Sequence, residues 1–570
     1  MRSKLIFICL MVLNCNALFS QKIVHTEILG RPTDKSIIVQ TFFDSDIEAS
    51  IQYGKKSGEY SNQTNWVSAL KDEHLEVLID NLEPDTKYYY RLNYRLPKSS
   101  TFTSRPEFYF HTQRKVSSSF SFVVQADPHM DSSSNSQLYS ICLQNQLDDS
   151  PDFMIDLGDI LMSDKLTNAS KKVTHDTVTY RSHLMRTYYE ISSHSVPLFL
   201  ALGNHEGEAG WYQNGTSENV AIWGTLDRKK YFPNPYPDNF YTGDTTNYKF
   251  VGIRQSYYAW TWGDVLFIVL DPYWFTTPKP DSLNGWRWTL GKTQYDWLKT
   301  TLETSKSKFK FVFAHQIIGG DPQGRGGTEY ANKYEWGGEN FDGSAGFTKN
   351  RPGWYKPIKE LLAENRVSIF FHGHDHFFGK QEKNCLIYQE TPQPSLPNFQ
   401  NANWAKEYGY LEGQILPNAG HLRVNVSSDG VKVDYVRAYL PKNENGSRHN
   451  KDVSATYFIG KVNCYDSLST GVPVLWNSNY IDELVYPNPF EVQTKIEFVL
   501  YKSEKTSLFI YNEIGRMVRA LIVDSFVNEG KFQIYWDGKD AYGSELPKGS
   551  YMYVLKSESI EKTGKIILNK

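Results

Sequence analysis

Five segments of this chain share one design, in which an apolar stretch typical of a buried strand is followed directly by polar residues. In the clearest case, the run from Val367 to Phe371 is followed by His374 and His376. The five segments are residues 120–129, 153–159, 198–206, 309–315 and 367–376. Sites in open α/β sheets form beyond the carboxyl ends of the strands, so we expect five strands in one layer to bring these polar residues together. From residue 120 to about 439, such apolar runs alternate with helix-like stretches, as expected for layered α/β or α+β folds.

The polar residues that follow the five strands are the ligand types of a metal site. They are Asp127, His129, Asp159, Asn204, His315, His374 and His376. Carboxylate, amide and imidazole groups suit divalent or trivalent ions such as Zn, Fe or Mn. The set contains no cysteine, so a thiolate site is not expected. A carboxylate such as Asp159 can bridge two cations about 3.5–4 Å apart, which lower the pKa of a shared water and hold a phosphoryl group for in-line attack. His205 directly follows Asn204, where it is placed to protonate a leaving oxygen.

The order of these motifs resembles that of the calcineurin-like metallophosphoesterase superfamily: D-x-H, G-D, G-N-H-E, a lone histidine after a strand, and G-H-x-H. The resemblance implies a four-layer α/β/β/α sandwich within residues 118–440 and a binuclear metal centre. The ligands it implies for one ion are Asp127, His129, Asp159 and His376, and those for the other are Asp159, Asn204, His315 and His374. It also implies that His205 acts as a general acid, without binding metal, when a metal-bound hydroxide attacks a phosphate ester.

Residues 22–114 contain short alternating segments separated by turn residues, which predict a small β-sandwich. Residues 81–91 are similar to the L-x-P-x-T-x-Y segment of fibronectin type III domains, in which a tyrosine hydroxyl closes the corner between strands. Such a domain ahead of the phosphoesterase motifs resembles the purple acid phosphatases. The match is partial. Met162 occupies the position of a metal-bound tyrosine in those enzymes, and His129 supplies the histidine of D-x-H, which those enzymes do not have. The purple chromophore is therefore not expected, and the identity of the two metals is left open.

Both ends of the chain indicate export. Residues 1–21 resemble a secretory signal peptide, with Arg2 and Lys4 before a short apolar run and a cleavage site near Ser20 or Gln21. Residues 441–483 are expected to be a connector. Residues 484–570 are all-β in pattern and resemble the immunoglobulin-like C-terminal sorting domains of the type IX secretion system, which implies passage through the periplasm to the outside or the outer cell surface.

Bulk properties exclude some partners. The chain has 570 residues with a formal net charge of −3, which offers no electrostatic surface for nucleic acid. Outside the short apolar run near the start, we find no stretch apolar enough to span a bilayer. The expected helices cover residues 135–147, 171–191, 293–304 and 352–364, the last with Pro352 in its first turn.

Substrate choice is expected to come from two irregular segments, residues 207–260 and 319–351, which are rich in Gly, Asn, Trp and Tyr. Arg325, Arg351 and His372 are candidates to contact phosphate oxygens, because an arginine fork matches them bidentately. The first hypothesis is a secreted binuclear-metal phosphoesterase that acts on phosphomonoesters, either small molecules or extracellular substrates. The alternatives are a phosphodiesterase or nucleotide-pyrophosphate hydrolase, and a cell-surface binding protein whose phosphoesterase domain is inert.

Overall fold

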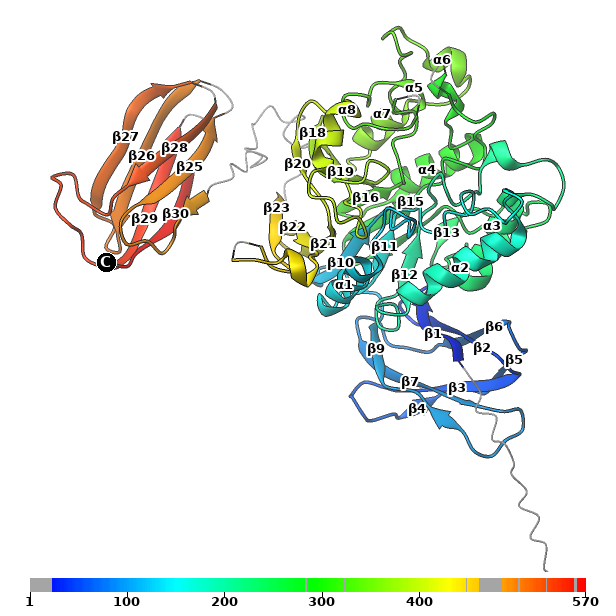
Figure 1. Cartoon of the computed structure of the whole chain (residues 1–570). Helices are drawn as coiled ribbons and strands as arrows, with labels where there is room; N and C mark the ends of the chain where they lie inside the picture. Colours follow the sequence, from blue (N-terminus) through cyan, green and yellow to red (C-terminus); the bar gives the residue numbers. More distant parts are fainter. Residues whose placement is uncertain are drawn as a thin grey trace, which may run out of the picture. The chain divides into compact units, whose positions relative to one another are not determined.

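The computed structural model describes residues 23–460 and 484–570, apart from 282–283, 322, 447, 501–502, 529 and 558–560 (Figure 1). The expected signal peptide and the later part of the expected connector, residues 461–483, lie outside the described residues. The chain divides into two compact units, Met1–Asn463 and Cys464–Lys570. Within the described residues, no helix has both the length and the apolar character needed to cross a membrane.

The first unit begins with a β region made of two antiparallel sheets. One sheet contains β1 (Ile23–Gly30), β2 (Ile37–Phe43) and β6 (His74–Ile79). The other is built on β3 (Ile47–Gly54) and β7 (Lys87–Arg95), flanked by β4 (Asn62–Gln63), β5 (Val67–Ala69), β8 (Thr103–Ser104) and β9 (Phe108–His111). Strands of both sheets contribute to one apolar core. Tyr88 accepts a hydrogen bond from the Glu83 amide at 3.0 Å, which is the expected tyrosine contact across the corner.

The central domain contains two sheets. The first has the order β12 (Leu198–Leu200), β11 (Met154–Asp156), β10 (Phe120–Gln125), β21 (Gly420–Ser427), β22 (Gly430–Arg437) and β23 (Val453–Gly460). The second has the order β13 (Thr242–Gly243), β14 (Tyr258–Trp262), β15 (Val265–Val269), β16 (Phe309–Phe313), β17 (Ile369–His372), β19 (Leu386–Glu390), β18 (Phe378–Lys383) and β20 (Gln414–Leu416). β10, β11 and β12 are parallel in the first sheet, as are β15, β16, β17 and β19 in the second.

This arrangement corrects two expectations. The five strands that precede the polar motifs do not lie in one layer, because β10, β11 and β12 belong to the first sheet and β16 and β17 to the second. The expected connector starts too early, because β23 pairs with β22 along its length and completes the edge of the first sheet. Alternating burial along β23 reflects this pairing, with one face turned to the sheet core and the other exposed.

Aromatic side chains hold the two sheets together. The ring of Phe122 on β10 lies 5.1 Å from that of Phe267 on β15 and 5.9 Å from that of Phe311 on β16, measured between centroids. Phe371 on β17 lies 6.4 Å from Phe122. Edge-to-face and tilted packing of this kind suits aromatic rings and buries large apolar areas. Packing on both faces therefore explains why every residue of β15 and β16 is buried.

Helices cover the outer faces of the two sheets. α1 (Ser136–Asp148) and α2 (His175–Tyr189) share a core with the first sheet, and α4 (Lys292–Thr304) and α7 (Ile358–Glu364) share one with the second. Side-chain caps explain two of the starts: Asn135 accepts from the Leu138 amide, and Thr174 forms a capping box with Thr177.

Two helix predictions need correction. α7 begins only after Pro357 rather than at Pro352, which lies in a turn six residues before the helix. The segment 207–260, expected to be irregular, contains α3 (Val220–Tyr231), whose start is capped by the Asn219 side chain. Among its described residues, the segment 319–351 holds the short helices α5 (Tyr334–Gly337) and α6 (Phe347–Asn350) and no longer helix.

The second unit is a β-sandwich. One sheet contains β24 (Leu484–Tyr486), β25 (Thr494–Leu500) and β28 (Gly530–Trp536), and the other contains β27 (Met517–Val527), β26 (Glu504–Asn512), β29 (Gly549–Ser557) and β30 (Glu561–Leu568). Phe498, Leu508 and Trp536 lie in the core that the two sheets share. The all-β expectation for this part of the chain is confirmed.

Candidate metal centre

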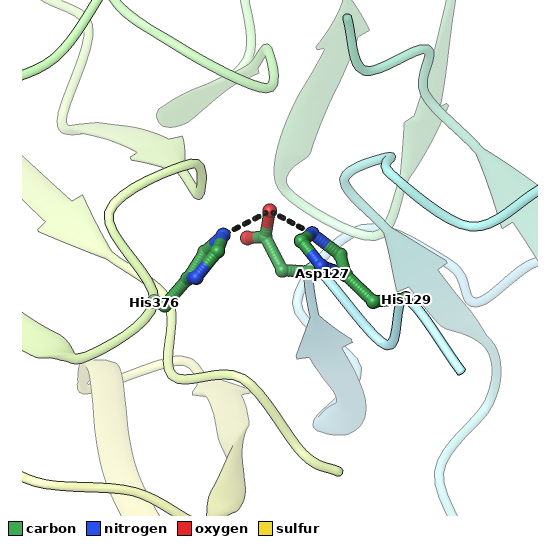
Figure 2. Close-up of side chains that lie close together, drawn as sticks. All are labelled: Asp127, His129 and His376. Carbon is green, nitrogen blue, oxygen red and sulfur yellow. Dashed lines mark ion pairs between the residues drawn. The ribbon is translucent and has the colours of Figure 1, made fainter. Parts of the chain in front are cut away.

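The polar residues that follow the five strands converge at one edge of the paired sheets. Two groups of side chains lie there, each with its ligand atoms within 4.8 Å of one another. The first group, shown in Figure 2, contains Asp127, His129 and His376, and the second contains Asp159, His315 and His374. The convergence follows from the fold, because the carboxyl ends of the parallel strands in both sheets reach this edge.

The two groups adjoin through their carboxylates. Oδ2 of Asp159 lies 3.5 Å from Nε2 of His129 and 3.4 Å from Nε2 of His315, so one oxygen faces both groups. Oδ1 of Asp127 lies 3.4 Å from Nε2 of His376 and 3.6 Å from Nε2 of His129. Asp159 therefore occupies the position between the groups that a bridging carboxylate needs.

Three unpaired atoms test whether these residues suit a metal ion. Oδ1 of Asp127, Nε2 of His129 and Oδ1 of Asn204 are buried and have no hydrogen-bond partner within the described parts of the chain. Buried polar atoms of native proteins almost always have a partner. All three are ligand atoms by type, and the fit supports a site that holds cations.

Neighbouring groups orient the imidazoles toward this centre. Nδ1 of His315 donates to the Leu157 carbonyl at 3.1 Å, which leaves Nε2 as the free ligand atom. Nε2 of His374 lies 3.3 Å from the Gln323 carbonyl, and its Nδ1 lies 3.1 Å from Nε2 of His315. Nδ1 of His129 lies 3.6 Å from Oδ2 of Asp131, a residue that sequence reasoning missed. Partners of this kind fix the ring and its tautomer in metal sites.

The backbone at the site is unusual. Asp127, His129, Asp159, His374 and His376 all have positive φ, between 50° and 80°. Residues with side chains rarely adopt this conformation, and where they do, the strain is often tied to function. Here the turns allow side chains that follow a strand directly to point at a common centre.

Glycines allow the motif loops to approach one another. A Cβ atom at Gly203 would lie 2.3 Å from the Asp159 amide nitrogen, and one at Gly373 would lie 2.6 Å from Oδ2 of Asp127. The Asp127 Oδ2 atom also accepts from the His374 amide at 2.9 Å. The glycine in G-N-H-E and the glycine in G-H-x-H are therefore required by contact between loops.

The charges of the centre favour cations. Burial alone raises the pKa of Asp127, but the nearby His315 and His376 outweigh it and hold that pKa well below its usual range. Burial lowers the pKa of His315, and the neighbouring Asp159 and Asp127 outweigh it and raise that pKa to about 9. The carboxylates therefore stay ionised, and a bound cation competes with a proton for His315.

His205 has a separate hydrogen-bond system. Its Nδ1 lies 3.0 Å from Oδ1 of Asp164, and the Tyr212 hydroxyl donates to Oδ2 of Asp164 at 2.9 Å. The His205 amide donates to Oδ1 of Asp159 at 2.8 Å. Sequence reasoning missed Asp164 and Tyr212, because neither follows a strand; the only signal is that Asp164 comes five residues after Asp159.

Glu206 stabilises the same loops through hydrogen bonds to their backbone amides. Its carboxylate is fully buried and accepts from the amides of Asp159 at 2.9 Å, Ile160 at 2.6 Å and Leu161 at 3.0 Å. The acidic residue of G-N-H-E therefore holds the G-D turn rather than joining the ligand groups.

A cavity of about 220 Å³ opens beside the second group. Its lining includes Asp164, Asn204, His205, Gln323, Arg325 and His374. Arg325 reaches the cavity, but its Nη1 donates to the His374 carbonyl at 2.9 Å and to Oδ1 of Asp375 at 3.0 Å.

The other two predicted phosphate contacts lie elsewhere. Arg351 pairs with Glu335 and donates to the Trp286 and Trp288 carbonyls. His372 is buried, with its Nδ1 2.7 Å from Oε2 of Glu390. Neither lines the cavity, because each is engaged by a buried carboxylate behind it.

Family models match two regions of the chain. Residues 120–378, which include all seven predicted ligands, match the family model of the calcineurin-like phosphoesterases, and residues 484–569 match that of the secretion system C-terminal sorting domain. No curated protein matches the chain. A structure of PhoD is similar in fold, with a TM-score of 0.55 and 14% identity over 77% of this chain and 91% of that one. Purple acid phosphatase PPD1 from yellow lupin (Lupinus luteus) seeds has a TM-score of 0.48 and 14% identity over 76% of this chain and 74% of its own.

Proposed function

Residues 120–378 form a calcineurin-like phosphoesterase domain, and from this premise we propose that the protein is a secreted phosphoesterase that uses two metal ions to hydrolyse phosphate monoesters. The observation that carries the proposal is the pair of adjoining His/Asp groups that share Asp159, with His205 beside them. Unpaired buried ligand atoms at Asp127, His129 and Asn204 support an active centre, since a decayed one would have lost part of this set.

The proposed ligand sets follow the two groups. One ion is held by Asp127, His129, Asp159 and His376, and the other by Asp159, Asn204, His315 and His374. When bound, two such cations neutralise charge on the phosphoryl group and lower the pKa of a water molecule. Their identity is left open among Zn, Fe and Mn, because all three suit mixed oxygen and nitrogen ligands.

The protein's own contribution to bond cleavage is assigned to His205. Asp164 accepts from Nδ1, which fixes the orientation of the ring and leaves Nε2 as the nitrogen that can donate to a substrate in the cavity that His205 lines. A leaving oxygen in that cavity then takes a proton from Nε2 as the ester bond breaks. Tyr212, through its hydrogen bond to Asp164, keeps the carboxylate in place.

The cavity suits a small leaving group. Its volume of about 220 Å³ is below the roughly 300–1,000 Å³ of typical ligand sites, and a space of this size accommodates one ester substituent.

The finer parts of the fold and the route of export belong to the same proposal. Two sheets that pack through aromatic side chains, with helices on their outer faces, support the four-layer α/β/β/α sandwich. The hydrogen bond from the Glu83 amide to the Tyr88 hydroxyl supports the fibronectin type III assignment for residues 22–114. The sorting domain at residues 484–569 supports export through the type IX secretion machinery, after a signal peptide directs the chain to the periplasm.

Parallel assays of the purified, metal-loaded protein test the function. Phenyl phosphate and diphenyl phosphate are compared as substrates, with metal content measured on the same sample. We expect two metal equivalents and faster turnover of the monoester. Faster turnover of the diester contradicts the monoester assignment and favours a phosphodiesterase, and turnover of neither ester with fewer than two metals favours a surface binding protein.

A further inference from the structure

The cavity beside His205 is the place where the leaving group of a substrate must lie. A proton donor has to be within hydrogen-bond reach of the oxygen that departs, and His205 lines this cavity together with Asn204 and His374 of the second group. The part of the substrate that extends beyond that oxygen therefore meets the remaining walls of the cavity. This reasoning rests on the proposed function.

Those remaining walls are aromatic and basic. Trp211 and Trp288 both line the cavity, and their rings meet nearly at right angles, with centroids 5.9 Å apart. Trp211 also contacts the ring of Tyr273 at 6.4 Å, so its orientation is held from two sides. An indole held in this way offers a flat face to a ring at little cost in side-chain entropy.

Lys279 lines the same cavity from an exposed position. Its ammonium lies 5.9 Å from the ring centroid of Trp211, at the outer limit of a cation–π contact, so this weak contact leaves the ammonium able to reach a ligand. The other basic group, Arg325, is bound to Asp375 and the His374 carbonyl and stacks on Tyr408 at 4.3 Å. Lys279 is thus the cation best placed to meet a charge on the substrate.

The acidic content of the cavity agrees with an anionic ligand. Asp164 is the carboxylate residue in the lining, and its two oxygens are engaged by His205 and Tyr212. Among the described residues that line the cavity, an anionic group on the ligand would therefore meet Lys279 without an unpaired carboxylate opposing it.

From these contacts we infer that the cavity is a leaving-group subsite for phosphate monoesters whose alcohol part carries a ring and a second negative charge, with the ring against Trp211 and the charge at Lys279. In the reaction, the bond from phosphorus to the leaving oxygen breaks and a bond from a water oxygen to phosphorus forms. His205 gives its Nε2 proton to the leaving oxygen, and the attacking water supplies the proton that restores it. Trp211 and Lys279 hold the departing part and exchange no protons.

A matched pair of substrates tests the role of Lys279 on the full chain reconstituted with Zn²⁺ or Mn²⁺. We expect kcat/KM for 4-carboxyphenyl phosphate to exceed that for phenyl phosphate by about threefold or more, as for a partly exposed ion pair. Lys279→Ala should abolish this preference. Lys306→Ala, at an exposed lysine on another part of the domain, serves as the matched control and should keep the preference. An equal preference in wild type and Lys279→Ala overturns the inference.

The role of the ring is tested separately. Trp211→Leu should lower kcat/KM about fivefold more for phenyl phosphate than for ethyl phosphate, since aromatic contacts are worth roughly 0.5–1.5 kcal/mol beyond buried area. Trp211→Phe should recover most of the loss. An equal loss for the aryl and alkyl esters would show that Trp211 acts only through packing, and would overturn its assignment.

Binding of non-hydrolysable ligands tests the subsite even if the protein hydrolyses no ester. Should no ester turn over, the proposed function falls, and calorimetry with non-hydrolysable phosphonates then decides about the subsite. Tighter binding of 4-carboxybenzylphosphonate than of benzylphosphonate in wild type, lost in Lys279→Ala, supports the subsite. Equal affinity for the two phosphonates in wild type overturns it.

Discussion

Asp156 makes the stability of the central domain depend on pH. Its side chain is fully buried at the end of β11, where the Tyr189 hydroxyl donates to Oδ2 at 2.6 Å and the Gly158 amide donates to Oδ1 at 3.1 Å. Burial is the largest influence and raises the pKa of Asp156 from 3.8 to about 7, against the lowering effect of these hydrogen bonds. The folded protein therefore holds a proton at Asp156 over a pH range in which the unfolded chain has released it.

The sign and size of the effect follow from linkage. Between pH 4 and pH 7 the folded state binds more protons than the unfolded state, so stability falls as the pH rises through this window. The shift is about three pKa units, and at 1.36 kcal/mol per unit the loss is about 4 kcal/mol. Asp156→Asn cannot ionise and should escape this loss. The difference in unfolding free energy between variant and wild type should therefore change by about 4 kcal/mol from pH 4 to pH 8, in favour of the variant.

Urea unfolding of the metal-free protein, with EDTA present throughout, measures this difference. Hydrogen exchange of the peptide that contains β11 localises the readout, because a chain of two units need not unfold in one step. Asp176→Asn, at an exposed carboxylate in the first turn of α2, is the control and should reproduce the wild-type pH profile. A difference between Asp156→Asn and wild type that is the same at pH 4 and pH 8 would refute the reasoning.

Three further predictions concern the proposed function. Asp159→Asn should lose metal and activity together, because the oxygen between His129 and His315 loses its charge; metal analysis that still finds two equivalents contradicts this role. His205→Ala should keep both metals but lose about 10²–10⁴-fold in kcat, and metal loss in that variant would place His205 among the ligands instead. Deletion of residues 484–570 should leave activity intact and retain the protein in the periplasm. Equal amounts of truncated and full-length protein outside the cell would show that these residues are not a sorting signal.

The ligands were within reach of sequence reasoning because each sits directly after an apolar strand. Asp127 and His315 each follow such a run by only two positions, and parallel strands bring their carboxyl ends to one edge. The number of layers was not within reach, because a fully apolar strand such as β15 reads the same in a single sheet covered by helices and in two sheets packed face to face.

Residues that act through another side chain were harder to find. Asp164 lies in a turn and Tyr212 in the short 3-10 helix Gly210–Tyr212, and both meet His205 only after the first sheet and its connections have folded. The predicted phosphate contacts at Arg351 and His372 rest on residue type alone. Arginine and histidine near a motif suggest anion binding, but Glu335 and Glu390 lie behind them and engage their side chains away from the cavity.

The chemistry of the centre was determined by the order of the sequence motifs, since ligand atoms, strand ends and the glycines between them are all local features. Only the tertiary structure decided which side chains lie together. It places the oxygen of Asp159 between the two groups and the carboxylate of Asp164 against His205. It also places the indoles of Trp211 and Trp288 and the ammonium of Lys279 around the cavity. The physical reason is that local patterns report burial and backbone direction, whereas distances between residues far apart in the chain are set by the packing of two sheets against each other.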